Sequence, residues 1–269
     1  MNINIRGRLF DLSKPKVMGI LNLTPDSFYD GGVHNEINKI EDHVNKMVND
    51  GMDILDIGGY SSKPGAKNIS VDEELSRVIP ILKHIRKIFP ELVISIDTFR
   101  SKIASASLNE GADIINDISG GTLDKNMMSV VAKNNCPYIL MHMQGNPQNM
   151  QNDPSYENVT LEIIQYLAQR IKIAHDNNIV DIIVDPGFGF GKTLEHNFEI
   201  LNNLEKFNVL DTPILAGFSR KSMIYKTLKT SSEKALNGTS SLNTIALTKG
   251  AKILRVHDVK EAKECIILH

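Results

Sequence analysis

Polar side chains stand at or just after the ends of several short apolar runs in this chain of 269 residues. Three of them, Asp97, Asn116 and Asp185, can accept hydrogen bonds, and the amide of Asn116 can also donate them. Such groups suit a flat heterocycle that carries several N–H groups. The other members of this series are Asn22, Lys221, Arg255 and His257.

A second group of residues has the chemistry of an anion site. Arg255, His257 and Lys63, together with the hydroxyls of Ser61 and Ser62, suit a phosphate. The net charge of the whole chain is -2, which gives no broad attraction to nucleic acid or to an anionic membrane. We therefore expect any anion site to be local.

Three apolar residues lie on loops that are rich in glycine. Phe28, Pro64 and Phe190 could form the walls around an aromatic ligand, or they could anchor their loops to the core. The sequence leaves both interpretations open.

Lys221 permits two kinds of chemistry. It could form a Schiff base with a carbonyl substrate, or it could donate a hydrogen bond and a positive charge to a ligand. Ser222 is the next residue, at the start of a helical stretch whose exposed N–H groups attract a carboxylate or phosphate. A solvated start of a helix is the alternative for both residues.

Two further carboxylates receive a structural interpretation. We expect Asp56 and Asp117 to end their strands and to cap the helix that comes next in the chain. We also reject a nucleotide-binding P-loop at residues 186–193, because Pro186 stands where the first glycine of that motif belongs.

The elements that must position these residues alternate between strands and helices. Short apolar runs bounded by turn signals predict strands that are buried on both faces. We expect strands at residues 17–22, 52–58, 93–97, 113–117, 138–142, 182–185, 213–217 and 252–257. Apolar spacing predicts helices at 38–50, 74–85, 127–135, 161–177, 222–228, 240–248 and 259–267, and one that ends before Gly111.

Eight strands that alternate with helices predict one (β/α)8 TIM barrel, in a single domain over residues 1–269. A small hairpin at residues 2–12, with its turn at residues 6–8, precedes the barrel. A doubly wound open sheet is the alternative, but it calls for a G-x-G-x-x-G motif in the first strand–helix turn, and the chain has none there. In a barrel, the polar groups at the strand ends converge on one rim, at the carboxyl ends of the strands.

Composition predicts a cytoplasmic protein. No segment approaches the roughly 18 consecutive apolar residues of a membrane span, and we expect no secretory signal. The two cysteines, Cys136 and Cys265, lie far apart without a C-x-x-C partner, which favours reduced thiols.

Several motifs in the same order resemble those of the dihydropteroate synthase family. The resemblance covers nearly the whole chain and is far more specific than any single motif. The motifs are GILNLTPDSF at 19–28, IDT at 96–98, INDISG at 115–120, MHMQG at 141–145, DPGFGFGK at 185–192, GFSRKS at 217–222 and RVHD at 255–258.

This resemblance implies a pterin-binding TIM barrel that acts as a transferase in folate biosynthesis. Hydroxymethyl-dihydropterin diphosphate and p-aminobenzoate would condense to dihydropteroate, with release of diphosphate. The resemblance also implies Mg²⁺, a homodimer and a site of the kind that sulfonamides target. No nucleic acid or membrane is expected as a partner.

Each position that matches a family motif receives an expected role. The pterin would bind to Asp97, Asn116, Met141, Asp185, Lys221 and Arg255, and Arg255 would also stack on it. The diphosphate would bind to Asn22, Lys63, Arg255 and His257, and Mg²⁺ would contact Asn22. The p-aminobenzoate pocket would consist of Phe28, Ser62, Pro64, Phe190 and Ser222. Catalysis would depend on Asp97, Lys221, Arg255 and His257.

These residues agree with a dissociative, SN1-like substitution. Diphosphate leaves readily when Mg²⁺, Arg255 and His257 neutralise its charge. The cation left on the exocyclic carbon can be stabilised by the negative charge of Asp97, so no protein nucleophile is required.

Two positions depart from the family pattern. Ser62 and Lys63 stand where the family usually has Thr-Arg, and Lys63 lacks the planar fork of arginine.

Three rival functions stay open. A methyltransferase relative that uses a reduced pterin would share the pterin-binding residues, but it would not need the diphosphate-binding residues Lys63, Arg255 and His257. The second rival is a Schiff-base aldolase centred on Lys221, and the third is a catalytically silent pterin-binding paralogue.

Overall fold

The computed structural model describes residues 1–23, 33–61 and 68–269. Four residues of the expected site, Phe28, Ser62, Lys63 and Pro64, lie outside the described residues.

In the described part of the chain, eight parallel strands form one sheet in the order β8-β7-β6-β5-β4-β3-β10-β9. The two ends of this order meet, because the amide of Val184 donates to the carbonyl of Pro213 at 2.9 Å and Val184 bridges to Ile214. The sheet is thus closed as a barrel, which confirms the predicted fold and excludes the open sheet. The strands are β3 (Lys16–Asn22), β4 (Ile54–Gly58), β5 (Val93–Asp97), β6 (Ile114–Asp117), β7 (Tyr138–Met141), β8 (Ile182–Asp185), β9 (Leu215–Ala216) and β10 (Ile253–Val256).

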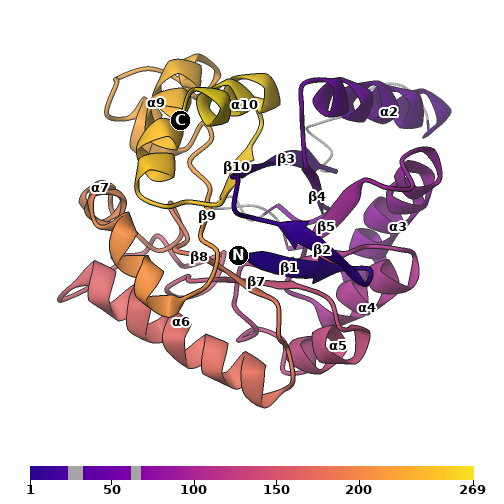
Figure 1. The fold of residues 1–269 in the computed structure, drawn as a ribbon, viewed down its shortest axis with the longest axis horizontal. Helices are drawn as coiled ribbons and strands as arrows, with labels where there is room; N and C mark the ends of the chain where they lie inside the picture. Colours follow the sequence, from indigo (N-terminus) through magenta and orange to yellow (C-terminus); the bar gives the residue numbers. More distant parts are fainter. Residues whose placement is uncertain (24–32, 62–67) are drawn as a thin grey trace.

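The helices surround the strands as an outer ring (Figure 1). They are α2 (Val33–Asn49), α3 (Val71–Ile88), α4 (Ser101–Asn109), α5 (Met127–Asn134), α6 (Val159–Asp176), α7 (Leu194–Asn202), α8 (Ser222–Tyr225), α9 (Leu236–Thr248) and α10 (Val259–Leu268). Two 3-10 helices, η1 (Leu204–Leu210) and η2 (Ser232–Lys234), complete the connections.

The main differences from the expected elements are four. Helix α2 begins at Val33, earlier than the expected residue 38. Helix α7 was not predicted, although a capping box between Thr193 and His196 marks its start. Strand β9 has only two residues. The residue before it, Ile214, contacts β8 through an isolated bridge to Val184 and is not counted in the strand. Helix α8 is shorter than expected, and α9 begins earlier.

A hairpin closes the amino-terminal end of the barrel. Its strands β1 (Asn2–Ile5) and β2 (Arg8–Asp11) are joined by Arg6 and Gly7, which both have positive φ angles, as two-residue hairpin turns require. The buried side chains of the hairpin pack on the first inward-facing residue of several strands, in a cluster that includes Ile3, Ile5, Leu12, Met18, Ile54, Val93, Ile114, Ile139, Ile183, Leu215 and Ile253. This end of the barrel is therefore filled.

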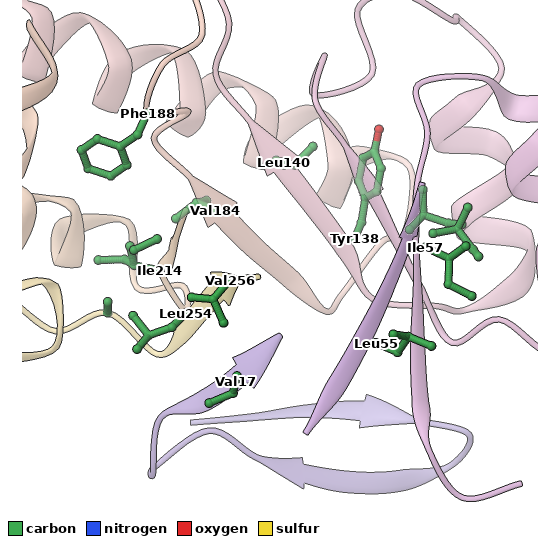
Figure 2. Packing of buried hydrophobic residues seen from close by; sticks show 14 of the residues in the cluster. Val17, Leu55, Ile57, Tyr138, Leu140, Val184, Phe188, Ile214, Leu254 and Val256 are labelled. Atoms are coloured by element: carbon green, nitrogen blue, oxygen red, sulfur yellow. The ribbon is translucent and has the colours of Figure 1, made fainter. Parts of the chain in front are cut away.

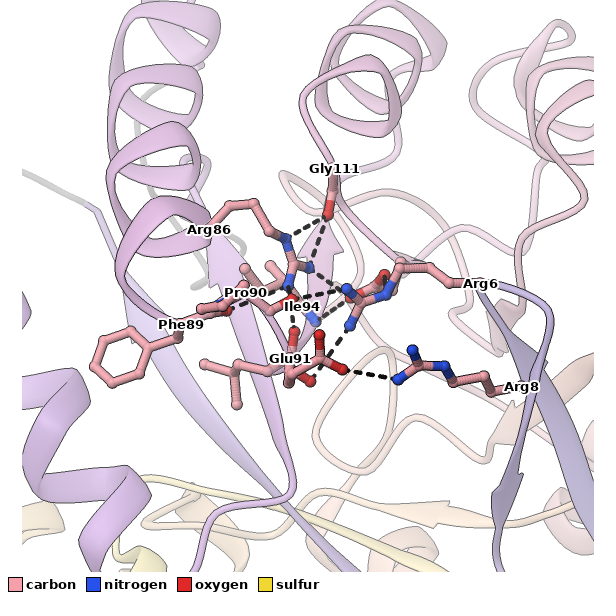
Figure 3. Close-up of polar contacts among 10 residues, drawn as sticks. Arg6, Arg8, Arg86, Phe89, Pro90, Glu91, Ile94 and Gly111 are labelled. Carbon is pink, nitrogen blue, oxygen red and sulfur yellow. Dashed lines mark hydrogen bonds and ion pairs between the residues drawn. The ribbon is translucent and has the colours of Figure 1, made fainter.

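An ion-pair cluster attaches the hairpin to the barrel (Figure 3). The buried carboxylate of Asp113 lies 2.9 Å from Nε of Arg6 and 2.7 Å from Nη2 of Arg86. Arg86 also donates to the backbone carbonyls of Gly111 and Leu92. Because the cluster lies at the filled end, we interpret it as structural.

Successive residues of each strand face opposite sides of the barrel wall. On β4, Leu55 and Ile57 pack in the outer cluster under the helices (Figure 2). Ile54 packs inside the barrel with the hairpin. The strand period of two then directs Asp56 into the barrel, above Ile54. The same alternation places Asn116 above Ile114, Asp185 above Ile183 and Arg255 above Ile253.

Candidate functional site

The strand register brings polar residues from distant segments to one level of the barrel. Asn22 of β3 pairs with Gly58, Gly58 pairs with Asp97, and Asp97 pairs with Asn116. A Cβ on Gly58 would lie 3.6 Å from Oδ1 of Asn22 and 3.7 Å from Oδ2 of Asp97. The glycine therefore leaves the space between these two polar side chains open.

Arg255 is held between two carboxylates. Its Nε donates to Oδ2 of Asp56 at 2.6 Å, and its Nη2 donates to Oδ2 of Asp97 at 2.7 Å. Only 19% of the Arg255 side chain is exposed, so both ion pairs are largely shielded from water. Nδ2 of Asn116 joins the network by donating to the same oxygen of Asp56 at 3.1 Å.

The interpretation of Asp56 as a strand-ending cap is wrong. Its side chain is fully buried in the middle of β4 and binds Arg255 and Asn116. A usable signal was present in the sequence: a carboxylate inside an apolar strand needs a charged partner. In the structure, its position two residues after the inward-facing Ile54 places it on the inner face.

Asp117 faces the opposite side of the wall. It accepts hydrogen bonds from the backbone of Ser119 and Gly121 and from the hydroxyl of Tyr138, at 2.8, 2.8 and 2.6 Å. It therefore closes the turn after β6, as a structural residue, and does not cap helix α5.

Burial controls the ionisation of the Asp97 carboxyl. Burial raises the pKa of Asp97 to about 7, although the Arg255 guanidinium opposes the shift. The negative charges of Asp56, Glu74 and Asp117 add to the rise. The carboxyl can thus change its charge within the physiological range.

Asp185 and Lys221 form a second group at the rim. Burial raises the pKa of Asp185 and lowers the pKa of Lys221 to about 8, and each residue opposes the shift of the other by its opposite charge. Nζ of Lys221 donates to the carbonyl of Phe188 at 2.5 Å and lies 4.9 Å from the centre of the Phe190 ring. Lys221 is therefore turned towards the loop after β8.

This loop is fastened to the one after β7 by a buried lysine. Nζ of Lys192 donates to the carbonyls of Gly187 and Phe190, both at 2.9 Å, and lies 3.0 Å from Nδ1 of His142. Gly187 has a φ of +74°, and a Cβ there would overlap the carbonyl oxygen of His142. The lysine thus has a structural role in place of the rejected phosphate contact.

Replacing Lys192 with methionine is expected to lower the free energy of unfolding by about 2–3 kcal/mol, because buried carbonyls lose their donor. Hydrogen exchange should become faster at residues 187–191. Lys172→Met is the matched control, since the side chain of Lys172 is 75% exposed and, among the described residues, pairs with Asp176 on α6. Equal effects of the two substitutions would contradict the proposed fastening.

The end of β10 is connected to the segment before α8. The Oγ of Ser219 accepts from the backbone amide of His257 at 3.1 Å and lies 2.9 Å from Nδ1 of its ring. Arg220 makes two hydrogen bonds to the carboxylate of Asp258 at 2.9 and 2.7 Å. These contacts place His257 close to the start of α8, where Ser222 is the first residue.

An apolar cluster lies at the same end of the barrel. Met141 is buried with Ile118, Met143 and Met150, and Phe190 packs against this cluster. The cluster provides a nonpolar surface near the carboxyl ends of β6 and β7.

Comparison with known proteins adds to this geometry. Residues 18–257 match the model of a family described as pterin binding enzyme. The chain is 44% identical to a dihydropteroate synthase of Escherichia coli K12, over 99% of this chain and 94% of that protein. It is 46% identical to a dihydropteroate synthase of Clostridium beijerinckii, over 91% of this chain and 89% of that one.

The chain belongs to the dihydropteroate synthase family. Solved structures of this family agree with its fold. A Yersinia pestis dihydropteroate synthase in complex with a sulfonamide drug superposes with a TM-score of 0.92 at 39% identity, covering 100% of this chain and 97% of that one. A Xanthomonas albilineans dihydropteroate synthase with 4-aminobenzoic acid gives 0.92 at 36%, covering 99% and 96%.

The predicted membership of the dihydropteroate synthase family and the predicted transferase class are thereby confirmed. The structure brings together Asp97, Asn116, Arg255 and, unexpectedly, Asp56 in one hydrogen-bonded network. It places the remaining described residues of the expected site, Asn22, Met141, Asp185, Phe190, Lys221, Ser222 and His257, on the loops and strand ends at the same end of the barrel. In the described ranges, no helix is long and apolar enough to cross a membrane.

Proposed function

We propose that the chain condenses hydroxymethyl-dihydropterin diphosphate with p-aminobenzoate to give dihydropteroate and diphosphate. The observation that supports this most is the network in which Arg255 is held by Asp56 and Asp97 at the carboxyl ends of the strands. It offers a fixed cation for a leaving anion beside a carboxylate for a developing cation. Family membership supports the choice of substrates.

The pterin would lie over the floor of the barrel, where several groups can hydrogen-bond to it. Asp97, Asn116 and Asp185 offer acceptors, and Lys221 offers a donor and a positive charge. Met141 and its apolar cluster provide one wall. Arg255 would stack on the ring, because a guanidinium has a flat face as well as five donors.

The diphosphate would bind to Asn22, Lys63, Arg255 and His257. The described residues contain no group of three or more His, Cys, Asp or Glu that could hold a metal ion. Mg²⁺ commonly binds through few protein oxygens together with substrate phosphates. The amide oxygen of Asn22 would supply the protein contact, and the bound ion would neutralise charge on the leaving diphosphate.

The reaction would proceed by departure of diphosphate before the amine attacks. Arg255 and His257 stabilise the charge of the leaving group, and Asp97 stabilises the positive charge left on the pterin. The p-aminobenzoate would bind among Phe28, Ser62, Pro64, Phe190 and Ser222, with its carboxylate at Ser222. Its amine attacks the exocyclic carbon and then loses a proton, so the chain needs no nucleophile of its own.

Diphosphate release tests this function directly. Release that requires Mg²⁺, with one dihydropteroate formed for each diphosphate when p-aminobenzoate is present, is the expected result. Tight pterin binding without release would favour the methyltransferase relative or the silent paralogue. Trapping of a carbonyl substrate on Lys221 by borohydride would favour the aldolase.

The pH dependence of kcat/KM should be bell-shaped. The rate should rise near pH 7, the raised pKa of Asp97, because the reaction needs the charged carboxylate. It should fall near pH 8, the lowered pKa of Lys221, because the lysine then loses its positive charge. Lys221→Arg should remove the basic limb, since arginine stays protonated. A basic limb that persists in this variant would contradict the assignment to Lys221.

We also propose that residues 1–269 act as one catalytic domain and that the protein is a cytoplasmic homodimer, as the family resemblance implies. Light scattering of the purified protein at micromolar concentration tests the dimer. A monomer mass with full activity would contradict it.

A further inference from the structure

We infer that Asp56 is a positioning residue for the condensation: it fixes the guanidinium plane of Arg255 and the amide orientation of Asn116. The inference rests on the proposed function and assigns a task to a carboxylate that need not touch either substrate.

The first support is the way in which Asp56 shares one oxygen. Its Oδ2 accepts from Nε of Arg255 at 2.6 Å and from Nδ2 of Asn116 at 3.1 Å. A single hydrogen bond leaves a guanidinium free to rotate about that contact. Two bonds through different nitrogens, to Asp56 and to Asp97, define its plane.

The second support concerns the face that Asn116 offers to a ligand. Asn116 is buried, and donation from its Nδ2 to Asp56 assigns the orientation of the amide. Its Oδ1 is then the atom that points away from Asp56. We therefore expect an N–H of the pterin, and not a ring nitrogen with a lone pair, to face Oδ1 of Asn116.

The third support is the loss of folding stability that comes with burying the Asp56 carboxylate. Its side chain is fully buried, and within the described residues its Oδ1 has no hydrogen-bond partner. A buried acceptor without a partner reduces stability, so its presence calls for an explanation. Positioning of two ligand-binding groups provides one, because no apolar residue could bind both donors.

Two substitutions separate positioning from packing. Asp56→Ala removes both hydrogen bonds, and kcat/KM for the pterin substrate should fall about 100-fold through loss of orientation. Asp56→Asn retains an oxygen that can accept from Arg255 and Asn116. Its kcat/KM should therefore be at least about tenfold higher than that of Asp56→Ala. The Asn variant also keeps the test valid if the Ala variant does not fold.

The matched control is at the other end of the barrel. Asp113 is also fully buried and pairs with two arginines, and it precedes β6. Asp113→Ala should lower the unfolding midpoint while the kcat and KM of the folded enzyme stay within twofold of wild type. A kinetic loss in Asp113→Ala equal to that in Asp56→Ala would overturn the inference, because the loss would then be structural.

A double-mutant cycle tests the route of the effect. The dissociation constant of the pterin diphosphate is measured by calorimetry for wild type, Asp56→Asn, Arg255→Lys and the double variant. If Asp56 acts through Arg255, its substitution should have a smaller effect in the Arg255→Lys background than alone. Additive effects, or kinetic constants unchanged in Asp56→Ala, would overturn the inference.

The outcomes for Asp56 and for the proposed function are distinguishable. Wild-type protein that binds the pterin diphosphate but forms no dihydropteroate would contradict the proposed function. The calorimetric cycle would still decide whether Asp56 positions Arg255.

Discussion

Replacing Asp97 with asparagine is expected to reduce kcat/KM about 1,000-fold while the barrel stays folded, because the side chain keeps its shape but loses its negative charge. The carboxylate lies 2.7 Å from Arg255 at the rim, where the proposed reaction develops positive charge on the pterin. The variant amide oxygen can still accept from Nη2 of Arg255. The loss should therefore appear in kcat, with a smaller change in pterin affinity.

The same substitution should not lower stability at pH 8. Burial raises the pKa of Asp97 to about 7, so the folded protein disfavours the charged carboxylate that the unfolded chain carries freely above its usual pKa of 3.8. The stability contributed by this group is therefore lost as the pH rises from about 4 to about 7. Asparagine does not titrate, so the Asp97→Asn variant should show no such loss of stability.

Thermal unfolding at two pH values checks the direction of this pH dependence of stability. At pH 8 the midpoint of Asp97→Asn should equal or exceed that of wild type, and at pH 5, where Asp97 is still protonated in the fold, the difference between the two midpoints should be smaller. A clearly lower midpoint for the variant at pH 8 would show that the ion pair with Arg255 outweighs the cost of burial.

Replacing Arg255 with glutamine should affect both stability and activity. The change leaves Asp56 and Asp97 near each other without their shared cation, which should lower the free energy of unfolding by about 3–5 kcal/mol. It also removes the cation proposed to stabilise the departing diphosphate, and kcat/KM should fall at least about 1,000-fold. Urea unfolding and steady-state kinetics measure the two effects separately.

Arg86→Gln is the control for this prediction. Arg86 binds the buried Asp113 at the filled end of the barrel, and Arg6 remains there as a second cation (Figure 3). We expect a smaller loss of stability and unchanged kinetic constants. Adding Asp56→Asn to Arg255→Gln should recover stability by removing an unpaired charge, but it should not recover activity. Recovered activity would contradict the role given to Arg255.

Local patterns in the sequence predicted most of the fold. Short apolar runs with turn signals located all eight strands, and the order of strands and helices predicted a closed barrel. The residues expected at the ends of strands, such as Asp97 and Asp185, do end β5 and β8. These predictions succeeded because strand formation and burial depend on residues that are near one another in the chain.

The sequence pattern did not predict helix α7 or the role of Asp56. The apolar spacing of α7 is interrupted, so only its capping box at Thr193 marks its start. Asp56 was assigned to a strand end although a carboxylate inside an apolar strand needs a charged partner. Which partner it binds, and from which face of β4, was decided by the strand register. A shift of one residue would have turned its side chain to the outer layer.

The sequence alone therefore determined the barrel, the family and the set of polar groups near its carboxyl-terminal rim. Only the tertiary structure decided which of these groups bind one another. Arg255 meets Asp56 across 199 positions of the chain and Asp97 across 158, and each contact depends on closure of the barrel and on the register of every strand between them. Closure and register are collective results of packing, so no local pattern around these three residues contains them.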